Sequence, residues 1–173
     1  MTKILVVSDS HGDDQIVEEI VAKFGNKVDT MFHTGDSEFY QKNPLVQQFH
    51  IVIGNMDYGV DFPVAEVVEL PEAKVFETHV HKYNVNFGLT TIMLAGEEQA
   101  ADIILFGHTH QLLATMEQGM LLVNPGSISQ PRGQYAYIGG TFAIIDIAKD
   151  SYEVQFYNRE LRPIKELNFV FKR

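Results

Sequence analysis

The fold is decided first by residues 3–12, KILVVSDSHG, in which an apolar run leads directly into a polar loop. Residues 3–8 are rich in Leu and β-branched side chains, so we predict a buried strand there. The loop that follows, residues 9–12, is made of turn formers and carries a carboxylate on Asp9 and an imidazole on His11. Chemically competent side chains therefore stand at the carboxyl end of a strand, where open α/β sheets build their sites.

The same strand-and-loop arrangement recurs twice in the first third of the chain. Apolar positions at helical spacing lie between residues 16 and 24, and strands are expected over 28–32 and 50–53, with a short helix over 45–49 between them. A β-α-β-α-β order of this kind favours an α/β fold with parallel strands.

The second half of the chain is expected to be mostly β. Residues 66–70 and 74–79 predict an antiparallel hairpin. After a short helical stretch at 96–101, the runs that predict strands are 103–106, 121–123, 137–147 and 151–158. No repeat, low-complexity tract or linker interrupts the sequence, so we expect residues 1–173 to form a single domain.

The composition restricts the chemistry that the chain can use. Because the sequence has no cysteine, disulfides, thiolate metal sites, iron–sulfur clusters and a Cys nucleophile are excluded, and any metal must bind through oxygen or imidazole. The 173 residues, of which 45% are hydrophobic, suffice for one well-filled core.

Charge and hydropathy limit the partners. The formal net charge of −10 argues against long-range attraction to nucleic acid or to an anionic membrane. The N-terminal apolar run is too short for a signal peptide, and no apolar stretch approaches the roughly 20 residues of a membrane span. We expect a cytoplasmic protein with no nucleic acid or membrane partner, and we leave homo-oligomerisation open. A phosphate substrate would need a local reversal of charge, for which bound divalent metal is the obvious source.

Side chains that can bind metal recur just beyond the predicted strands. They are Asp9, His11, Asp36, Asn55, His79, His81, His108 and His110. The pairs Asp9/His11 and His108/His110 are spaced i,i+2, so in extended backbone both members point the same way and can meet one ion. Taken singly, each residue has an ordinary explanation: Asp36 follows a glycine, as in many turns, and an isolated His is seldom a ligand. Independent turns would seldom produce all of these motifs in this order.

The motifs in chain order are Asp9-x-His11, Gly35-Asp36, Gly54-Asn55, Thr78-His79-x-His81, Gly107-His108-Thr109-His110 and Asn124-Pro125-Gly126-Ser127. This set resembles the calcineurin-like metallophosphoesterase superfamily, and within it the small YfcE-like phosphodiesterases of bacteria and archaea. The resemblance spans nearly the whole chain. It implies a four-layer αββα sandwich of two mixed sheets flanked by helices, with a dinuclear metal site at the strand ends.

The resemblance also implies a ligand map. One metal would be bound by Asp9, His11 and His110, the other by Asn55, His79 and His108, and both would be bridged by Asp36. Two divalent transition metal ions are expected, with Mn first and Fe, Ni, Co or Zn compatible with the same donors. With two aspartates and a bridging hydroxide the centre keeps a net charge of about +1, which can hold a small phosphate ester. The expected reaction is hydrolysis of a phosphodiester by attack of the metal-bridging hydroxide.

Two positions depart from the pattern of the larger relatives. Met56 stands where many of them carry a histidine that is taken to protonate the leaving group. Asp57 beside it is a candidate for that acid, for a partner of a ligand or for a turn residue, and we favour the structural roles. Val80 replaces the glycine usual between His79 and His81, and valine accepts fewer backbone conformations than glycine.

Four further residues are weighed beside the ligands. His81 shares a face with His79 if the segment is extended, so it is a candidate to touch substrate or donate a proton, or to support a ligand. Arg132, just beyond the Asn-Pro-Gly-Ser turn, is the nearest candidate for a phosphate clamp. His33 is expected only to end its strand, and His50 has no evident partner.

Other functions compete with a phosphodiesterase. A phosphomonoesterase would use the same fold and centre. The scaffold subunit of the retromer coat resembles this small fold but departs at the metal-ligand motifs, whereas this chain keeps Asp36 and Asn55, which favours catalysis. An amidohydrolase-like enzyme is disfavoured by the Gly-Asn-x-Asp and Gly-His-Thr-His order. The short segment between Asn55 and His79 leaves little room for a cap domain that would select one substrate.

Overall fold

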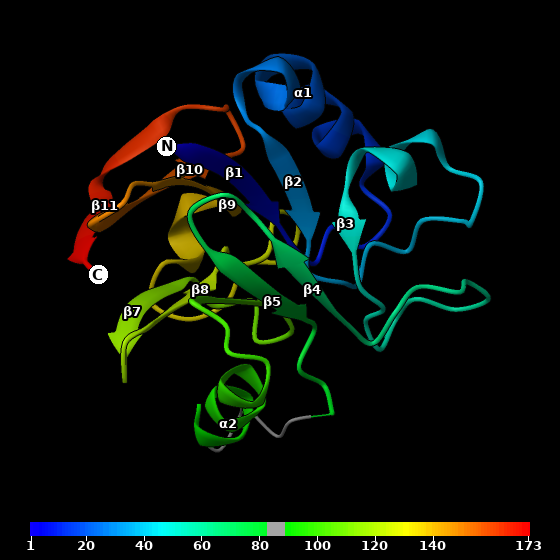
Figure 1. The fold of residues 1–173 in the computed structure, drawn as a ribbon. Helices are drawn as coiled ribbons and strands as arrows, with labels where there is room; N and C mark the ends of the chain where they lie inside the picture. Colours follow the sequence, from blue (N-terminus) through cyan, green and yellow to red (C-terminus); the bar gives the residue numbers. More distant parts are fainter. Residues whose placement is uncertain (83–88) are drawn as a thin grey trace.

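Two β-sheets with few helices make up the computed structural model, which describes residues 1–82 and 89–173 (Figure 1). The first half contains β1 (Thr2–Val7), α1 (Asp14–Phe24), η1 (Gly25–Lys27), β2 (Thr30–His33), η2 (Pro44–Gln48), β3 (His50–Ile51), β4 (Ala65–Glu69) and β5 (Lys74–Thr78). The second half contains α2 (Thr90–Glu98), β6 (Ile103–Phe106), β7 (Leu113–Glu117), β8 (Met120–Asn124), η4 (Ala136–Ile138), β9 (Thr141–Ile147), β10 (Ser151–Asn158) and β11 (Pro163–Lys172).

Both sheets are mixed. The six-stranded sheet has the order β11-β10-β9-β1-β2-β3, in which β1, β2 and β3 are parallel and the other three strands are antiparallel to their neighbours. The five-stranded sheet has the order β4-β5-β6-β8-β7, with a parallel centre of β5, β6 and β8 between two antiparallel edges. Each sheet therefore has a parallel segment whose carboxyl ends present loops on the same edge.

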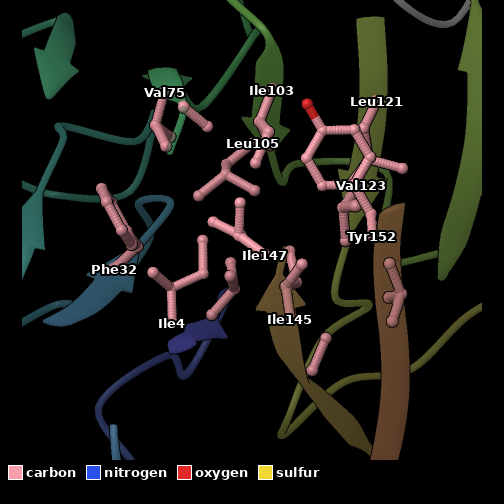
Figure 2. Packing of buried hydrophobic residues seen from close by; sticks show 14 of the residues in the cluster. Ile4, Phe32, Val75, Ile103, Leu105, Leu121, Val123, Ile145, Ile147 and Tyr152 are labelled. Atoms are coloured by element: carbon pink, nitrogen blue, oxygen red, sulfur yellow. The ribbon is translucent and has the colours of Figure 1, made fainter. Parts of the chain in front are cut away.

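The two sheets pack face to face over an apolar inner layer. In β1, Ile4 and Val6 point toward the other sheet while Leu5 and Val7 point toward α1, because successive side chains of a strand alternate between its faces. All four are fully buried. Figure 2 shows Ile4 of β1 and Leu105 of β6 in this layer.

Helices cover the outer faces. The first, α1, has a side-chain cap at its start, where the carboxylate of Asp13 accepts the N–H of Ile16. It buries Ile16, Ile20 and other apolar residues against the six-stranded sheet, and α2 buries Ile92 against the five-stranded one. The two helices lie on opposite sides of the paired sheets in Figure 1. The predicted α/β fold with four αββα layers is confirmed.

Several predicted boundaries were wrong. The helix expected at 96–101 is α2, which begins six residues earlier at Thr90, and the short helix expected at 45–49 is the 3-10 helix η2, which begins one residue earlier at Pro44. The strand expected to begin at 137 begins at Thr141, since Gly139 and Gly140 adopt φ values of 87° and 116° that a strand does not use. The edge strands β7 and β11 were missed. β7 is only partly buried along its length and lacks a clear apolar pattern, whereas β11 alternates, with Leu167, Phe169 and Phe171 on its buried face, so its signal was overlooked.

Within residues 1–82 and 89–173, no helix has the length and apolar character needed to cross a membrane.

Candidate metal centre

The predicted ligands all follow the carboxyl ends of strands in the parallel segments. Loops after β1, β2 and β3 carry Asp9, His11, Asp36 and Asn55, and those after β5 and β6 carry His79, His108 and His110. The loops after β1 and β2 are joined by backbone hydrogen bonds: the N–H of Asp9 donates to Gly35 O and the N–H of His11 to Asp36 O, each at 3.0 Å. Because the sheets pack face to face, the loops of both sheets meet at one edge of the sandwich.

A first group of side chains gathers Asp9, His11 and His110, with one donor atom of each within 4.8 Å of the others. His110 Nε2 lies 3.2 Å from Asp9 Oδ1, and the Nε2 atoms of His11 and His110 lie 3.3 Å apart. Burial alone would lower the pKa of His110, but its hydrogen bond to Asp9 and the charge of that carboxylate outweigh burial and raise this pKa. The site thus favours a positive charge at this point.

A second group gathers around His79. Its Nε2 lies 3.2 Å from Asp36 Oδ2, 3.2 Å from Asn55 Oδ1 and 3.9 Å from Asp9 Oδ1, and its ring centroid is 5.2 Å from that of His108. The structure therefore brings all seven predicted ligands together. Asp9 reaches both groups, since the second metal-competent set contains Asp9, Asp36 and His79.

The pKa shifts of this second group follow from its charges. Burial would lower the pKa of His79, but the hydrogen bond to Asp36 and the charges of Asp9 and Asp36 raise it. Burial would raise the pKa of Asp36, but the hydrogen bond and charge of His79 lower it. For His108, burial first and the nearby His79 second lower the pKa. Metal binds an ionised carboxylate and a neutral imidazole, so an ion at this site would take the place of the proton that the two carboxylates favour on His79.

The tautomers of three histidines are determined by their neighbours. Nδ1 of His79 donates to Thr34 O and Nδ1 of His110 donates to Gln130 O, both at 2.7 Å. Nδ1 of His11 faces Glu38 Oε1 at 2.8 Å. In the neutral form of each ring Nε2 then carries the lone pair toward the centre, which is how metal-binding histidines are oriented. Two such lone pairs facing each other at 3.3 Å fit a cation between them, so the donor set fits divalent metal.

The loop backbones are mostly left-handed rather than extended. Positive φ values occur at Asp9 (51°), His11 (47°), His108 (69°) and His110 (60°). The prediction that these pairs lie on extended backbone was therefore wrong, and side chains alternate only on extended backbone. Asp9 and His11 still fall in one group, whereas His108 lies beside His79 and His110 beside His11.

Val80 has the left-handed backbone that a glycine would adopt easily. Its φ is 70°, which is unusual for a β-branched residue and costs of the order of 1–3 kcal/mol. The side chain is 1% exposed and packs in the apolar cluster under α2, which offsets that cost. His81 consequently does not extend from His79, although their ring centroids are 5.6 Å apart.

The two candidates for proton transfer differ in their surroundings. Both carboxylate oxygens of Asp57 accept hydrogen bonds from loop donors: Oδ1 from Glu38 N–H at 2.6 Å and the Ser37 hydroxyl at 3.1 Å, and Oδ2 from Gly54 N–H at 2.8 Å. These contacts favour the structural role. His81 Nδ1 is buried without a hydrogen-bond partner among the described residues. Burial, and next the neighbouring His79, lower the pKa of His81. Their catalytic roles stay predictions.

The other histidines are accounted for by local contacts. His33 ends β2 as expected, and its ring contacts Ser10 Oγ at 3.0 Å and accepts the N–H of Gly35. Complete burial is the main reason that the pKa of His33 falls to about 4. His50 does have a partner, Glu66 Oε1 at 3.0 Å from its Nδ1, which the sequence could not reveal because the two residues lie on different sheets.

A cavity of about 330 Å³ opens beside the ligands. It is lined by His11, Asp36, Glu38, Asn55, Met56, His108, His110, Gln130 and Arg132. Arg132 therefore lies beside the centre, as predicted from the sequence. Glu38 and Gln130 were missed, and the only available signal for Glu38 was its position two residues beyond Asp36.

The fold and the donor set define an α/β protein with a candidate metal centre, and the sequence identifies its family. Residues 2–150 match the calcineurin-like phosphoesterase superfamily domain. The chain belongs to this superfamily, as its motifs indicated. Membership supports a metal-dependent phosphoesterase, which is a hydrolase.

Individual relatives agree with this assignment. The chain is 32% identical over 164 residues to the "Probable metallophosphoesterase YsnB" of Bacillus subtilis (strain 168), an alignment that covers 95% of each chain. It is 39% identical to a solved structure from Streptococcus pneumoniae TIGR4 described as a predicted phosphoesterase, with a TM-score of 0.94 over 99% of this chain and 98% of that one.

Two more distant solved structures show the fold alone. Vacuolar Protein Sorting 29 from Cryptosporidium parvum is 19% identical with a TM-score of 0.74, covering 99% of this chain and 96% of that one. YfcE, a phosphoesterase from E. coli, is 22% identical with a TM-score of 0.69, covering 96% and 98%. The expected likeness to YfcE-like proteins is confirmed.

Proposed function

We propose that this chain hydrolyses phosphodiester bonds of small substrates at a centre of two divalent metal ions. The observation that carries the proposal is the pair of Nε2 atoms of His11 and His110, 3.3 Å apart, each with its Nδ1 already placed against an acceptor. In their neutral form the two rings repel each other through their lone pairs, and the carboxylate of Asp9 favours a positive charge at this point. A divalent cation turns that repulsion into ligation, which supports a metal-binding function over a purely structural one.

The seven ligands are assigned to two ions as the resemblance implies. Asp9, His11 and His110 would hold one, Asn55, His79 and His108 would hold the other, and Asp36 would contact both. Asp9 is close enough to His79 to contribute to the second ion as well. Mn is the first choice among ions that accept oxygen and imidazole donors. When bound, a pair of divalent ions supplies an activated water nucleophile at neutral pH and stabilises negative charge on the phosphoryl oxygens.

The residues around the ions have separate tasks. Thr34 and Gln130 hold the rings of His79 and His110 through their carbonyl oxygens, so neither ring can turn away. Arg132 provides the guanidinium that binds the phosphate in the cavity. His81 remains the candidate proton donor for the leaving group, because its ring lies beside those of His79 and His108.

Preference for a diester over a monoester rests on two features of the cavity. Met56 lines the cavity at the position where many relatives carry a histidine acid. Monoester hydrolysis depends more on protonation of the leaving group than diester hydrolysis does. Diester hydrolysis mainly needs a strong nucleophile. The Glu38 carboxylate also lines the cavity, and it repels a doubly charged monoester more than a singly charged diester.

The competing scaffold function has less support. The likeness to Vacuolar Protein Sorting 29 concerns the fold, whereas Asp36 and Asn55 keep both the chemistry and the proximity to His79 that a metal site needs. Because both sheets contribute ligands, we take residues 1–173 as one catalytic unit. The cytoplasmic location expected from the sequence stays a prediction.

Metal content and substrate preference test the proposal together. Elemental analysis of the Mn-loaded protein should give about two ions per chain. Its rate on bis(p-nitrophenyl) phosphate should exceed that on p-nitrophenyl phosphate in the same buffer. Met56→His should raise the monoester rate relatively more, and Tyr58→His, two residues on and exposed, is the matched control. A metal-free protein that Mn does not activate would refute the proposal, and faster monoester cleavage would refute the diester preference.

A further inference from the structure

We propose that Glu38 is a positioning residue that orients His11 toward the metal centre, and that Asp57 holds Glu38 in place. The inference rests on the proposed function. Glu38 lies outside the motifs that identify the family. It is nevertheless the one side chain of the described residues that contacts the Nδ1 atom of a predicted ligand ring, at 2.8 Å from His11.

The contact with Glu38 determines which nitrogen of the His11 ring carries the lone pair. A carboxylate only accepts hydrogen bonds, so the proton of the neutral ring is kept on Nδ1 and Nε2 carries the lone pair. That Nε2 atom faces His110 Nε2 at 3.3 Å. Rotation of the ring, or transfer of the proton to Nε2, would remove one ligand from the first group.

His11 depends on its partner more than the other two oriented histidines do. The rings of His79 and His110 are held by the backbone carbonyls of Thr34 and Gln130, which no side-chain substitution removes. His11 is held by a side chain that is itself partly open to solvent, with 37% of its surface exposed. A single substitution can therefore release one ligand of the centre and leave the others oriented.

The backbone of Glu38 is itself held in an unfavourable conformation. Its φ is 56°, a left-handed value that is uncommon for residues other than glycine. Asp57 stabilises it, because Oδ1 accepts the N–H of Glu38 at 2.6 Å while Oδ2 accepts that of Gly54 at 2.8 Å. One carboxylate thus ties together the loops after β2 and β3. Asp57 acts through Glu38 on His11 and does not itself line the cavity.

A direct metal-binding role for Glu38 fits the geometry less well. Its Oε1 lies against the ring nitrogen of His11 that points away from the centre. Among the described residues, neither set of acidic and histidine donors that converges within 4.8 Å includes Glu38. Direct binding of a phosphate is disfavoured by charge. Orientation of His11 is the role that remains.

The test compares two substitutions of Glu38 with a matched pair elsewhere. Glu38→Ala removes the acceptor, whereas Glu38→Gln keeps an amide oxygen that can accept the same N–H. Glu66, which contacts Nδ1 of His50 at 3.0 Å away from the centre, gives the control variant Glu66→Ala. Metal affinity is measured on chelator-treated protein by equilibrium dialysis with Mn. The tautomer of His11 is read from its ring nitrogens by two-bond ¹H–¹⁵N NMR without metal.

Glu38→Ala should weaken binding of one of the two ions by about 10–100-fold, the usual effect of losing such a partner, and His11 should lose its uniform Nδ1–H tautomer. Glu38→Gln should stay within a few-fold of the unaltered protein, and Glu66→Ala should change neither readout. Unchanged affinity and tautomer in Glu38→Ala would overturn the proposal. An equal loss of metal affinity in Glu38→Gln would also overturn it, since the charge of Glu38 rather than the orientation of His11 would then be responsible. If the unaltered protein binds no metal, the proposed function fails, while the NMR comparison still tests the Glu38–His11 contact.

Discussion

The layer between the sheets and the loops at their carboxyl edge differ in backbone conformation. In the layer, strands such as β1 keep regular pairing and alternate their side chains strictly between two apolar faces. In the loops, positive φ values recur at non-glycine residues: Asp9, His11, Asp36, Glu38, Val80, His108 and His110. Each such conformation is costly. The regular layer stabilises the molecule, and part of that stability is used to hold the ligands in strained loops.

Removal of one ligand should therefore damage activity and leave the fold intact. Asp36→Asn should lower the rate by about 10²–10⁴-fold, the range seen when an electrostatic or acid–base group is deleted. Asp57→Asn should lower it less, because Asp57 acts only through the loops. Steady-state hydrolysis of bis(p-nitrophenyl) phosphate gives both values, with the exposed Asp150→Asn as control. Equal losses at positions 36 and 57 would make Asp57 an essential acid.

The opposite behaviour is expected in the inner layer. Leu105 is fully buried between the sheets, so Leu105→Ala should lower the free energy of unfolding by about 2–5 kcal/mol. Urea denaturation measures this loss. The specific activity of the folded fraction should hardly change, because the side chain does not reach the ligands. A fully stable Leu105→Ala with impaired catalysis would contradict this division of roles.

Glu77 is the exception within the layer, since its carboxyl is fully buried and both oxygens lack a hydrogen-bond partner among the described residues. Burial first, and the charge of Glu66 second, raise the pKa of Glu77 well above its ordinary value. As pH rises through the ordinary Glu pKa, the unfolded chain releases this proton while the folded chain keeps it. Stability should therefore fall until the raised pKa is passed.

Glu77→Gln mimics the protonated carboxyl and should remove this decline. The gain should be about 1.4 kcal/mol for each pH unit above the ordinary Glu pKa, until the raised pKa is reached. Urea midpoints at pH 5 and pH 8 measure the effect, and Glu66→Gln controls for the neighbouring charge. If the stabilities of Glu77→Gln and of the unaltered protein change in parallel with pH, the Glu77 carboxyl does not keep its proton in the folded chain.

The smallest effect is expected where a left-handed residue lies away from the ligands. Gln118 and Gly119 join β7 to β8 with φ values of 50° and 83°, the pattern of a tight hairpin turn that prefers Asn-Gly. Gln118→Asn should raise the free energy of unfolding by about 0.5 kcal/mol and leave activity unchanged. Thermal unfolding and a rate assay test both parts. A loss of activity would link this turn to the centre.

Much of the fold followed from local patterns in the chain. The apolar run of residues 3–8, the helix that ends at Phe24 and the hairpin over 66–79 were all predicted near their observed places. Their periodicity comes from burial on one or both faces. The edge strand β7 was not predictable in this way, because its side chains are only partly buried and its position comes from pairing with β8.

The sequence by itself determined which residue types stand at each strand end, because a carboxylate or imidazole after an apolar run is visible in the chain. This was enough to identify the seven candidate ligands and the family. Only the tertiary structure decided how those side chains are held: His11 by Glu38, 27 residues away, and His110 by Gln130 O. The physical reason is that a hydrogen bond between distant loops depends on where the packed sheets place them, and no local pattern encodes that position.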